Sequence, residues 1–90
     1  MQYKYAESFR RDYRKLPEDI KAKASKALKL FAENSRHPSL KTHKIKGTKN
    51  PTVFEGYIDA GYRFTFHYEE DAVVYRRIGL HKIIDEEARQ

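Results

Sequence analysis

The sequence predicts a small α+β fold in which an N-terminal strand and a two-helix hairpin are followed by an antiparallel sheet. The chain has 90 residues. A chain of this length buries only about 60–65% of its unfolded surface, which leaves room for one modest core. Apolar residues recur at helical spacing in the first half, and polar and apolar residues alternate in much of the second half. We therefore expect one domain over residues 1–90, with the element order β-α-α-β-β-β and a short C-terminal tail.

The first strand is expected at residues 2–5, where polar and aromatic residues alternate. The spacing changes at Ala6, and from there to Leu16 an apolar residue recurs every three to four positions, which predicts the first helix. That stripe consists of Ala6, Phe9, Tyr13 and Leu16. Pro17 interrupts the pattern and, because proline is tolerated at a helix start, marks the beginning of a second helix.

The second helix is expected to run to about Asn34. Glu18 and Asp19 suit the positive end of its dipole, and Ser35 and Pro38 follow the end of the pattern. Its buried stripe is predicted to be Ile20, Ala24, Ala27, Leu28 and Phe31. Four lysines project away from that stripe, so the two helices form a basic hairpin.

Residues 36–52 contain two prolines, one glycine and no long apolar run, which predicts a connecting loop. Three strands are expected at 53–58, 62–68 and 72–79, with turns at 59–61 and 69–71. If Gly61 takes the left-handed position of a three-residue turn, strand alternation fixes the two faces, whereas a two-residue turn would shift the pairing. The core face then holds Phe54, Ile58, Tyr62, Phe64, Phe66 and Tyr68, with a gap at Gly56, and the open face holds Tyr57, Arg63, Thr65 and His67. With the helices on one face, the other face remains open to a partner.

Composition excludes several classes of protein. The chain has no cysteine, so a disulfide scaffold, an all-cysteine zinc site and a thiol nucleophile are impossible. No run approaches the roughly 18–20 apolar residues needed to cross a bilayer, and the first residues lack the apolar core of a signal peptide. We therefore expect a cytoplasmic protein without a membrane partner. We also expect no cofactor, because the core is small and no zinc-binding spacing such as HExxH occurs.

The charge is unevenly distributed. Residues 1–50 hold 14 Lys and Arg against 5 Asp and Glu (+9), and residues 51–90 hold 5 against 8 (−3), which gives the net charge of +6. Clustered cations favour a polyanionic partner, because they neutralise phosphates and release counterions. A solvated basic helix face explains the same composition equally well.

Two histidines and several cations would converge if the open sheet face forms a site. Cleavage of RNA requires a base for the 2′-hydroxyl, an acid for the 5′-oxygen and positive charge on the phosphoryl oxygens. Histidine suits both proton-transfer roles near neutral pH, and lysine and arginine supply the charge without a metal. The candidates are His43, Lys44, Lys46, Arg63, Arg76 or Arg77, and His81.

Each candidate also has a structural explanation. His43 lies in a polar loop, where a histidine is usually only solvated, and Lys44 and Lys46 would keep an edge strand from aggregating. Arg63 would pair across the sheet with Glu55.

The last strand supplies two further candidates. Arg76 and Arg77 are neighbours and would lie on opposite faces, so only one would point into the site, and the expected register favours Arg77. His81 follows the strand end, where loops often carry chemistry on a rigid scaffold.

Three segments resemble a known group of proteins. Residues 40–47 (LKTHKIKG), 60–66 (AGYRFTF) and 77–81 (RIGLH), together with the element order, resemble the RelE/ParE superfamily of toxins from type II toxin-antitoxin systems. The first and third segments, each with its histidine, are most similar to the RelE/YafQ/HigB-type mRNA interferases. The resemblance covers nearly the whole chain. It implies a small RelE-like toxin domain that cuts mRNA, typically on the ribosome, and that an antitoxin protein silences.

The resemblance also implies roles for individual residues. His81 would be the general acid, and His43 would be a base or a phosphate contact. Arg63 would steady the scissile phosphate, with Lys44 and Lys46 as auxiliary cations. Relatives commonly carry an aromatic residue four positions after the last histidine, and this chain has Asp85 there. An aromatic residue there would help to hold a base. Its absence affects the rate or the way RNA is held, and Tyr57, Tyr62 or Tyr75 could partly compensate for it.

Three functional hypotheses follow. The first is a metal-independent endoribonuclease toxin that leaves a 2′,3′-cyclic phosphate. The second is a ParE-like inhibitor of DNA gyrase, against which the paired histidines weigh. The third is a catalytically inactive relative that binds RNA or an antitoxin, which Asp85 keeps open. In each toxin hypothesis, an acidic amphipathic antitoxin segment would lie along the helical hairpin or the sheet.

Overall fold

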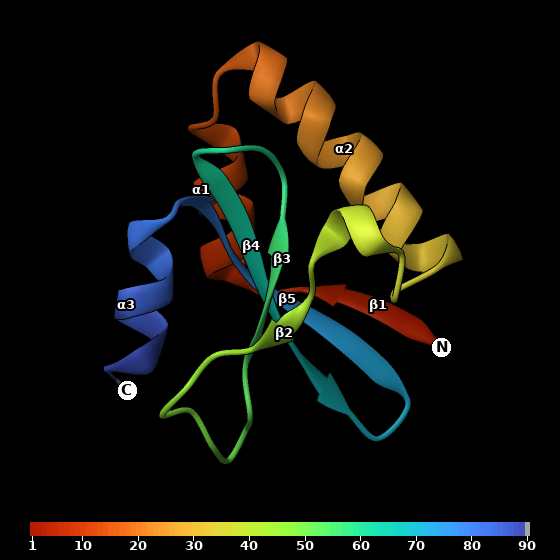
Figure 1. Ribbon diagram of the computed structural model, residues 1–90, viewed down its shortest axis with the longest axis vertical. Coiled ribbons are helices and arrows are strands. Elements are labelled where there is room, and N and C mark those ends of the chain that lie inside the picture. The colour runs from red at the N-terminus through yellow and green to blue at the C-terminus, as the bar shows by residue number, and fades with distance from the viewer. Residues whose placement is uncertain (90) are drawn as a thin grey trace.

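The chain folds into a five-stranded sheet with helices on both faces (Figure 1). The structure is a computed structural model that describes residues 1–89. In chain order the elements are β1 (Gln2–Tyr5), α1 (Glu7–Arg14), α2 (Glu18–Glu33), the 3₁₀ helix η1 (Pro38–Leu40), β2 (His43–Lys44), β3 (Phe54–Tyr57), β4 (Tyr62–Glu69), β5 (Ala72–Leu80) and α3 (Lys82–Ala88). None of the helices described is long and apolar enough to span a membrane.

The sheet is mixed, with the strand order β1-β5-β4-β3-β2. Strands β3, β4 and β5 form the expected antiparallel meander. β1 pairs with β5 in parallel, with Gln2 opposite Ala72 and Tyr5 opposite Tyr75. The expected antiparallel sheet is therefore extended by a parallel edge strand, whose partner the sequence had not indicated. All other strands lie between β1 and β5 in the sequence, and a connection of that length permits parallel pairing, which a short hairpin does not.

The predicted faces of the meander are largely confirmed. Phe54 lies opposite Phe66 and Gly56 opposite Phe64. The predicted core-face residues that are buried or packed against the core are Phe54, Ile58, Tyr62, Phe64 and Phe66. Tyr68 is 46% exposed at the far end of β4. Gly61 does not take the left-handed conformation that was considered for this turn, because Gly47 is the one glycine with positive φ among the residues described.

The hydrophobic core lies between the helical hairpin and one sheet face. The Phe31 ring of α2 packs against the rings of Phe66, Phe64 and Tyr75, with centroids 4.8, 5.9 and 5.9 Å away. Such pairs add about 0.5–1.5 kcal/mol each beyond the apolar area that they bury. The gap predicted at Gly56 is filled by the Phe64 ring, whose atoms would lie 2.3 Å from a Cβ at position 56. The predicted stripe residues Phe9, Leu16, Ile20 and Ala24 complete the buried helix faces.

The opposite face of the sheet is partly covered, so two expectations are wrong. The residues after β5 form the helix α3 instead of a tail, and this helix buries Ile83 and Glu87. Thr65, expected on an open face, has no exposed surface because α3 lies over it. The expected loop 36–52 also contains η1 and the short strand β2.

A bulge in β5 changes the direction of two arginine side chains. The β4–β5 register shifts between Thr65 and Phe66, which pair with Arg77 and Tyr75, so Arg76 is the extra residue. In a regular strand neighbouring side chains point to opposite faces, but a bulge breaks that alternation. Both guanidinium groups therefore reach carboxylates of α3, and the expectation that Arg76 and Arg77 lie on opposite faces is wrong.

Candidate active site

A cavity of about 290 Å³ opens where β2, β3, β4 and the start of α3 meet. Its lining consists of Lys41, His43, Glu55, Tyr57, Arg63 and His81. Three of the six predicted site residues, His43, Arg63 and His81, thus come together from separate parts of the sequence. No group of three His, Cys, Asp or Glu side chains among residues 1–89 is arranged to hold a metal ion.

Both ring nitrogens of His43 lie close to acceptor oxygens, one in a hydrogen bond and one at an ion-pair distance. The antiparallel pairing of β2 with β3 places it opposite Glu55, and its Nε2 lies 3.3 Å from a carboxylate oxygen of that residue. Its Nδ1 lies 2.9 Å from the carbonyl oxygen of Lys41. Lys41 has a left-handed backbone conformation (φ 48°) at the end of η1, so the chain turns sharply just before β2. The His43 side chain is nevertheless 62% exposed to solvent.

Glu55 forms a buried part of the cavity wall. Its side chain is only 10% exposed, and a carboxylate removed from water needs hydrogen-bond or charge partners. One oxygen faces His43, and the other lies 3.9 Å from Nε of Arg63. The predicted pairing of Arg63 with Glu55 is therefore confirmed as an ion pair. The cavity therefore contains a carboxylate that lies between the imidazole of His43 and the guanidinium of Arg63.

Arg63 is fixed by the turn between β3 and β4. Its Nη1 donates to the carbonyl oxygens of Asp59 at 2.5 Å and Tyr62 at 2.9 Å. The Asp59 carboxylate closes this turn by accepting hydrogen bonds from the backbone N–H groups of Gly61 and Tyr62. Burial opposes the charge on Asp59, but the hydrogen bonds from Gly61 and Lys23 outweigh it and hold the pKa of Asp59 below its ordinary value. A charged Asp59 thus supports the turn that positions the guanidinium.

Among the rings that line the cavity, only that of His81 has no hydrogen bond, ion pair or cation–π contact within residues 1–89. His81 lies between the end of β5 and the first residue of α3, and its backbone N–H donates to the carbonyl oxygen of Gly61 at 3.1 Å. This bond ties the backbone of His81 to the turn that holds Arg63. Within residues 1–89 the imidazole of His81 has no hydrogen-bond partner, and the residue is exposed. Its ring is therefore free to exchange a proton with a bound molecule.

Tyr57 supplies the aromatic surface of the cavity. The ammonium of Lys41 and the guanidinium of Arg63 lie 4.5 and 4.6 Å from its ring centroid, which are cation–π contacts. Of the other two tyrosines considered, Tyr62 packs against the core and Tyr75 is buried within it. Burial raises the pKa of the Tyr75 hydroxyl above its ordinary value.

Sequence reasoning missed two cavity residues, Lys41 and Glu55. Glu55 was expected only as a partner of Arg63. A lone carboxylate between the aromatic Phe54 and Gly56 in a strand was the available signal, because such a charge needs a specific partner. Lys41 had no signal of its own, because no local pattern predicts the left-handed backbone that it adopts at the end of η1.

The remaining predicted site residues lie elsewhere. Lys44 and Lys46 are exposed and do not line the cavity. Arg77 was expected to point into the site, and this placement is wrong. Its Nε lies 2.6 Å from Asp12 of α1, and its Nη1 lies 2.9 Å from Glu86 of α3. The hydrogen bond to Asp12 outweighs the effect of burial and raises the pKa of Arg77 above its ordinary value.

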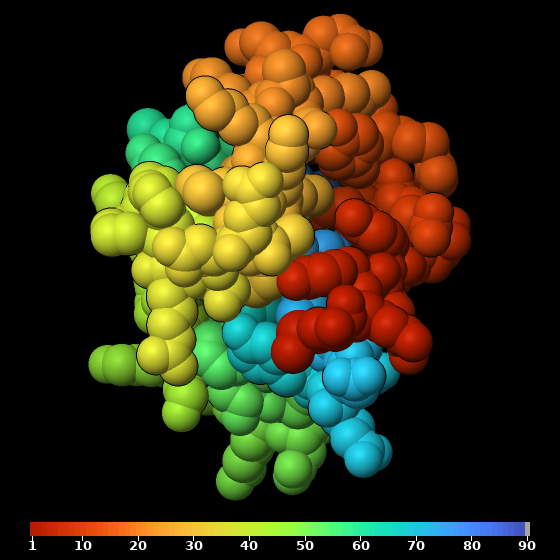
Figure 2. Space-filling model, turned by 90° about the vertical axis from the view of Figure 1, so that its right-hand side faces the viewer, coloured from red at the N-terminus to blue at the C-terminus, as the bar shows by residue number. Residues whose placement is uncertain are grey.

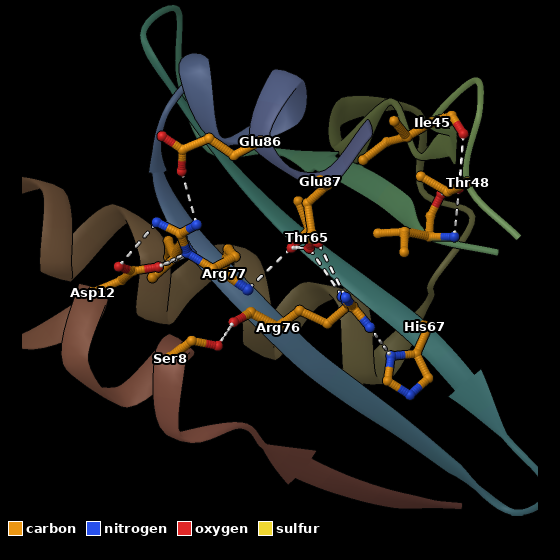
Figure 3. Close-up of polar contacts among 12 residues, drawn as sticks. Ser8, Asp12, Ile45, Thr48, Thr65, His67, Arg76, Arg77, Glu86 and Glu87 are labelled. Carbon is orange, nitrogen blue, oxygen red and sulfur yellow. Dashed lines mark hydrogen bonds and ion pairs between the residues drawn. The ribbon is translucent and has the colours of Figure 1, made fainter. Parts of the chain in front are cut away.

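A second polar cluster anchors α3 to the sheet beside the cavity (Figure 3). The carboxylate of Glu87 accepts hydrogen bonds from Arg76 Nε at 3.0 Å, Arg76 Nη2 at 3.1 Å and Thr65 Oγ1 at 2.7 Å. Nη1 of Arg76 lies 3.1 Å from Nδ1 of His67. This cluster holds the helix that begins directly after His81.

A larger hollow, the α1–α2 groove, lies away from the cavity. It has a volume of about 620 Å³ and is visible in Figure 2 between β1 and α1 in red and α2 in orange to yellow. Its aromatic lining is Tyr3, Tyr5, Phe9, Tyr13 and Tyr75, and its basic lining is Arg10, Arg14 and Lys29. Strand β1 borders the groove and ends the sheet, so its outer edge has no strand partner among the residues described.

Solved structures with the same arrangement of elements are toxins. YafQ from E. coli strain BL21(DE3) aligns over 92% of this chain and 96% of its own, with a TM-score of 0.75 and 13% identity. The YoeB/ParE toxin from Agrobacterium tumefaciens aligns over 90% and 99%, with a TM-score of 0.72 and 15% identity. The RelB-RelE antitoxin-toxin complex from Methanococcus jannaschii contains a chain that aligns over 92% and 95%, with a TM-score of 0.67 and 24% identity.

These comparisons establish the fold. No protein-family model matches the sequence, and no curated protein matches it. The structural matches cover nearly the full length of both chains, so the chain has the RelE/ParE-type toxin fold that the sequence segments suggested. Several of the matched toxins were solved in complex with their antitoxins, such as DinJ-YafQ from E. coli.

Proposed function

We propose that this chain is the toxin of a type II toxin-antitoxin system and that it acts as an endoribonuclease. It cleaves mRNA in the cytoplasm, on the ribosome, by general acid-base catalysis without a metal, and leaves a 2′,3′-cyclic phosphate. The observation that carries this proposal is the cavity in which His43 and His81 meet Arg63. Those groups supply the proton transfer and positive charge that phosphodiester cleavage needs.

His81 suits the general acid because no protein group occupies its imidazole within the residues described. A protonated ring there donates to the 5′-oxygen as the bond to phosphorus breaks. Arg63 suits the phosphate, since the β3–β4 turn holds its guanidinium in place before substrate arrives. Lys41 adds a second cation, and Lys44 and Lys46 meet more distant phosphates of the strand.

The test is primer-extension mapping of mRNA ends in cells briefly induced for the wild type, His81→Ala or His37→Ala. His37 is the matched control, because its ring contacts Ser39 at η1 and lies outside the cavity. We expect new ends in register with codons for the wild type and His37→Ala, and none for His81→Ala. Loss of a general acid costs about 10²–10⁴-fold in rate. Equal cleavage by His81→Ala contradicts the assignment.

The same experiment separates the alternatives. Growth arrest without new mRNA ends supports a ParE-like inhibitor of DNA gyrase. Neither arrest nor cleavage supports a catalytically inactive relative that binds RNA or an antitoxin. Product analysis completes the test, because a terminal 2′,3′-cyclic phosphate distinguishes attack by the 2′-oxygen from hydrolysis by water.

We further propose that an acidic, amphipathic segment of the cognate antitoxin binds the α1–α2 groove. The aromatic lining offers apolar area, and Arg10, Arg14 and Lys29 offer charge complementarity. The test is co-expression with the product of the adjacent gene. Leu28→Asp combined with Lys29→Glu places acidic groups in the groove and should abolish co-purification while mRNA cleavage persists. Undiminished co-purification contradicts this placement.

A further inference from the structure

We propose that Glu55 is the general base of this site and that His43 is a donor that holds it. This inference rests on the proposed ribonuclease activity and reassigns the base, which the resemblance had offered to His43. The carboxylate belongs to the only Asp or Glu that lines the cavity within the residues described. Three observations carry the assignment: the contacts of the two His43 ring nitrogens, the burial of Glu55, and the absence of a hydrogen-bond partner at the His81 ring within the residues described.

The contacts of His43 leave it no free acceptor. A carbonyl oxygen accepts hydrogen bonds and cannot donate, so Nδ1 carries the proton in the 2.9 Å contact with Lys41. The other nitrogen, Nε2, faces a carboxylate oxygen of Glu55 at 3.3 Å. This contact is at an ion-pair distance and is not a hydrogen bond, and because two facing lone pairs repel, it is favourable when Nε2 carries a proton. In this arrangement His43 has no lone pair to offer a 2′-hydroxyl.

Glu55 retains acceptor capacity in the cavity. Each carboxylate oxygen has two lone pairs, and Nε2 of His43 lies beside only one of the two oxygens. The other oxygen lies 3.9 Å from Nε of Arg63, which is an ion-pair distance too long for a hydrogen bond. That oxygen can therefore accept a hydroxyl proton. The other lining cations, Lys41 and Arg63, only donate.

Burial prepares Glu55 for this task. Its side chain is 10% exposed, so few waters compete for its lone pairs, and its pairing with β2 fixes its direction. A carboxylate used as a base is more effective when it is held in place and shielded from water. A surface glutamate such as Glu69, whose side chain is 49% exposed, has no such environment.

The resulting step balances in atoms and charge. The Glu55 carboxylate accepts the 2′-hydroxyl proton while the 2′-oxygen forms a bond to phosphorus. The bond between phosphorus and the 5′-oxygen breaks, and the leaving oxygen takes a proton from protonated His81. The products are a 2′,3′-cyclic phosphate and a 5′-hydroxyl, with Glu55 protonated and His81 neutral. Exchange with water restores both groups, so no oxidant, reductant or metal takes part.

The test is single-turnover cleavage of mRNA on programmed ribosomes by purified wild type, Glu55→Gln, Glu55→Ala and the control Glu69→Ala. Glu55→Gln keeps the shape and loses the base. We expect its cleavage rate at saturating substrate to fall by about 10²–10³-fold, while half-saturation changes little. Glu69→Ala should retain the wild-type rate. Circular dichroism verifies that each variant is folded.

Chemical rescue distinguishes a base from a structural residue. Glu55→Ala leaves a space beside Arg63 and His43 that formate can enter. We expect formate to raise its rate by at least about tenfold, and to leave His81→Ala unchanged. Cleavage by Glu55→Gln within about threefold of wild type overturns the inference, and so does a folded Glu55→Ala that formate does not rescue. A wild type that cuts no RNA refutes the proposed function instead, so the two failures are distinguishable.

Discussion

Replacing Glu87 with alanine should remove the main anchor of α3. The side chain is 2% exposed and accepts three hydrogen bonds, two from Arg76 and one from Thr65. Breaking a buried ion pair on one side costs about 3–5 kcal/mol. Arg76 keeps its contact with His67, and its side chain is 20% exposed, so we expect a loss near the lower end, about 3 kcal/mol.

This loss is measurable by urea unfolding followed by circular dichroism, and by thermal unfolding. For a domain of this size about 3 kcal/mol corresponds to a fall in Tm of about 12–24 °C. The matched control is Glu86→Ala on the same helix, because Glu86 is 41% exposed and its partner Arg77 keeps Asp12. We expect about 0.5–1 kcal/mol at most for that control. If Glu87→Ala is as stable as Glu86→Ala, the cluster does not anchor α3 and the reasoning is refuted.

Three further predictions concern the sheet and the cavity. Gly56→Ala should destabilise the fold by about 1–3 kcal/mol in urea unfolding, because its Cβ would meet the Phe64 ring; an unchanged midpoint contradicts this. The pKa of Asp59 is lowered in the folded protein, so its charge contributes stability that is complete above the ordinary aspartate pKa of about 4 and is lost as pH falls through the pKa of the folded state. Asp59→Asn should therefore flatten the acidic part of a curve of unfolding free energy against pH, and an unaltered curve is the contrary result. Tyr57→Ala should raise KM about tenfold or more in a cleavage assay, while Tyr57→Phe keeps the wild-type value, because stacking on a base needs only the ring; equal effects would exclude stacking.

Periodicity in the sequence was enough to predict the core. Phe9 and Phe31 of the two helix stripes, and Phe64 and Phe66 of the strands, are buried, because each lies on one face of a regular element. These predictions depend on local spacing alone, and local spacing is what a single sequence records. The mixed sheet was not predictable in this way, since β1 finds its partner β5 only through contacts across the whole chain.

The failures occur where regular spacing is interrupted. The bulge at Arg76 inserts one residue into β5, and every face assigned by alternation across that point is shifted. The helix α3 is short and carries the acidic residues Asp85, Glu86 and Glu87, a composition typical of a solvated tail. Its stability depends on partners in β4 and β5, which no local pattern indicates.

The cavity residues likewise include some that sequence segments indicated and some that only the fold brings into place. The segments that resemble RelE-type toxins led to His43, Arg63 and His81, and the cavity contains all three. Glu55 gains its importance from the β2–β3 register, which sets it opposite His43. Because β2 has only two residues, alternation of polar and apolar residues could not predict this strand or its register.

The cavity and the polar cluster around Glu87 are connected through α3. His81 begins where β5 ends, and its position depends on the backbone bond to Gly61 on one side and on the helix held by Glu87 on the other. The two arginines of β5 pair internally, Arg76 with Glu87, and Arg77 with Glu86 and Asp12. These arginines do not line the cavity, yet they fix the helix that follows His81. A cation that looks like a phosphate ligand in the sequence thus contributes to the site by holding its scaffold, and among the described residues the cations that line the cavity are Arg63 and Lys41.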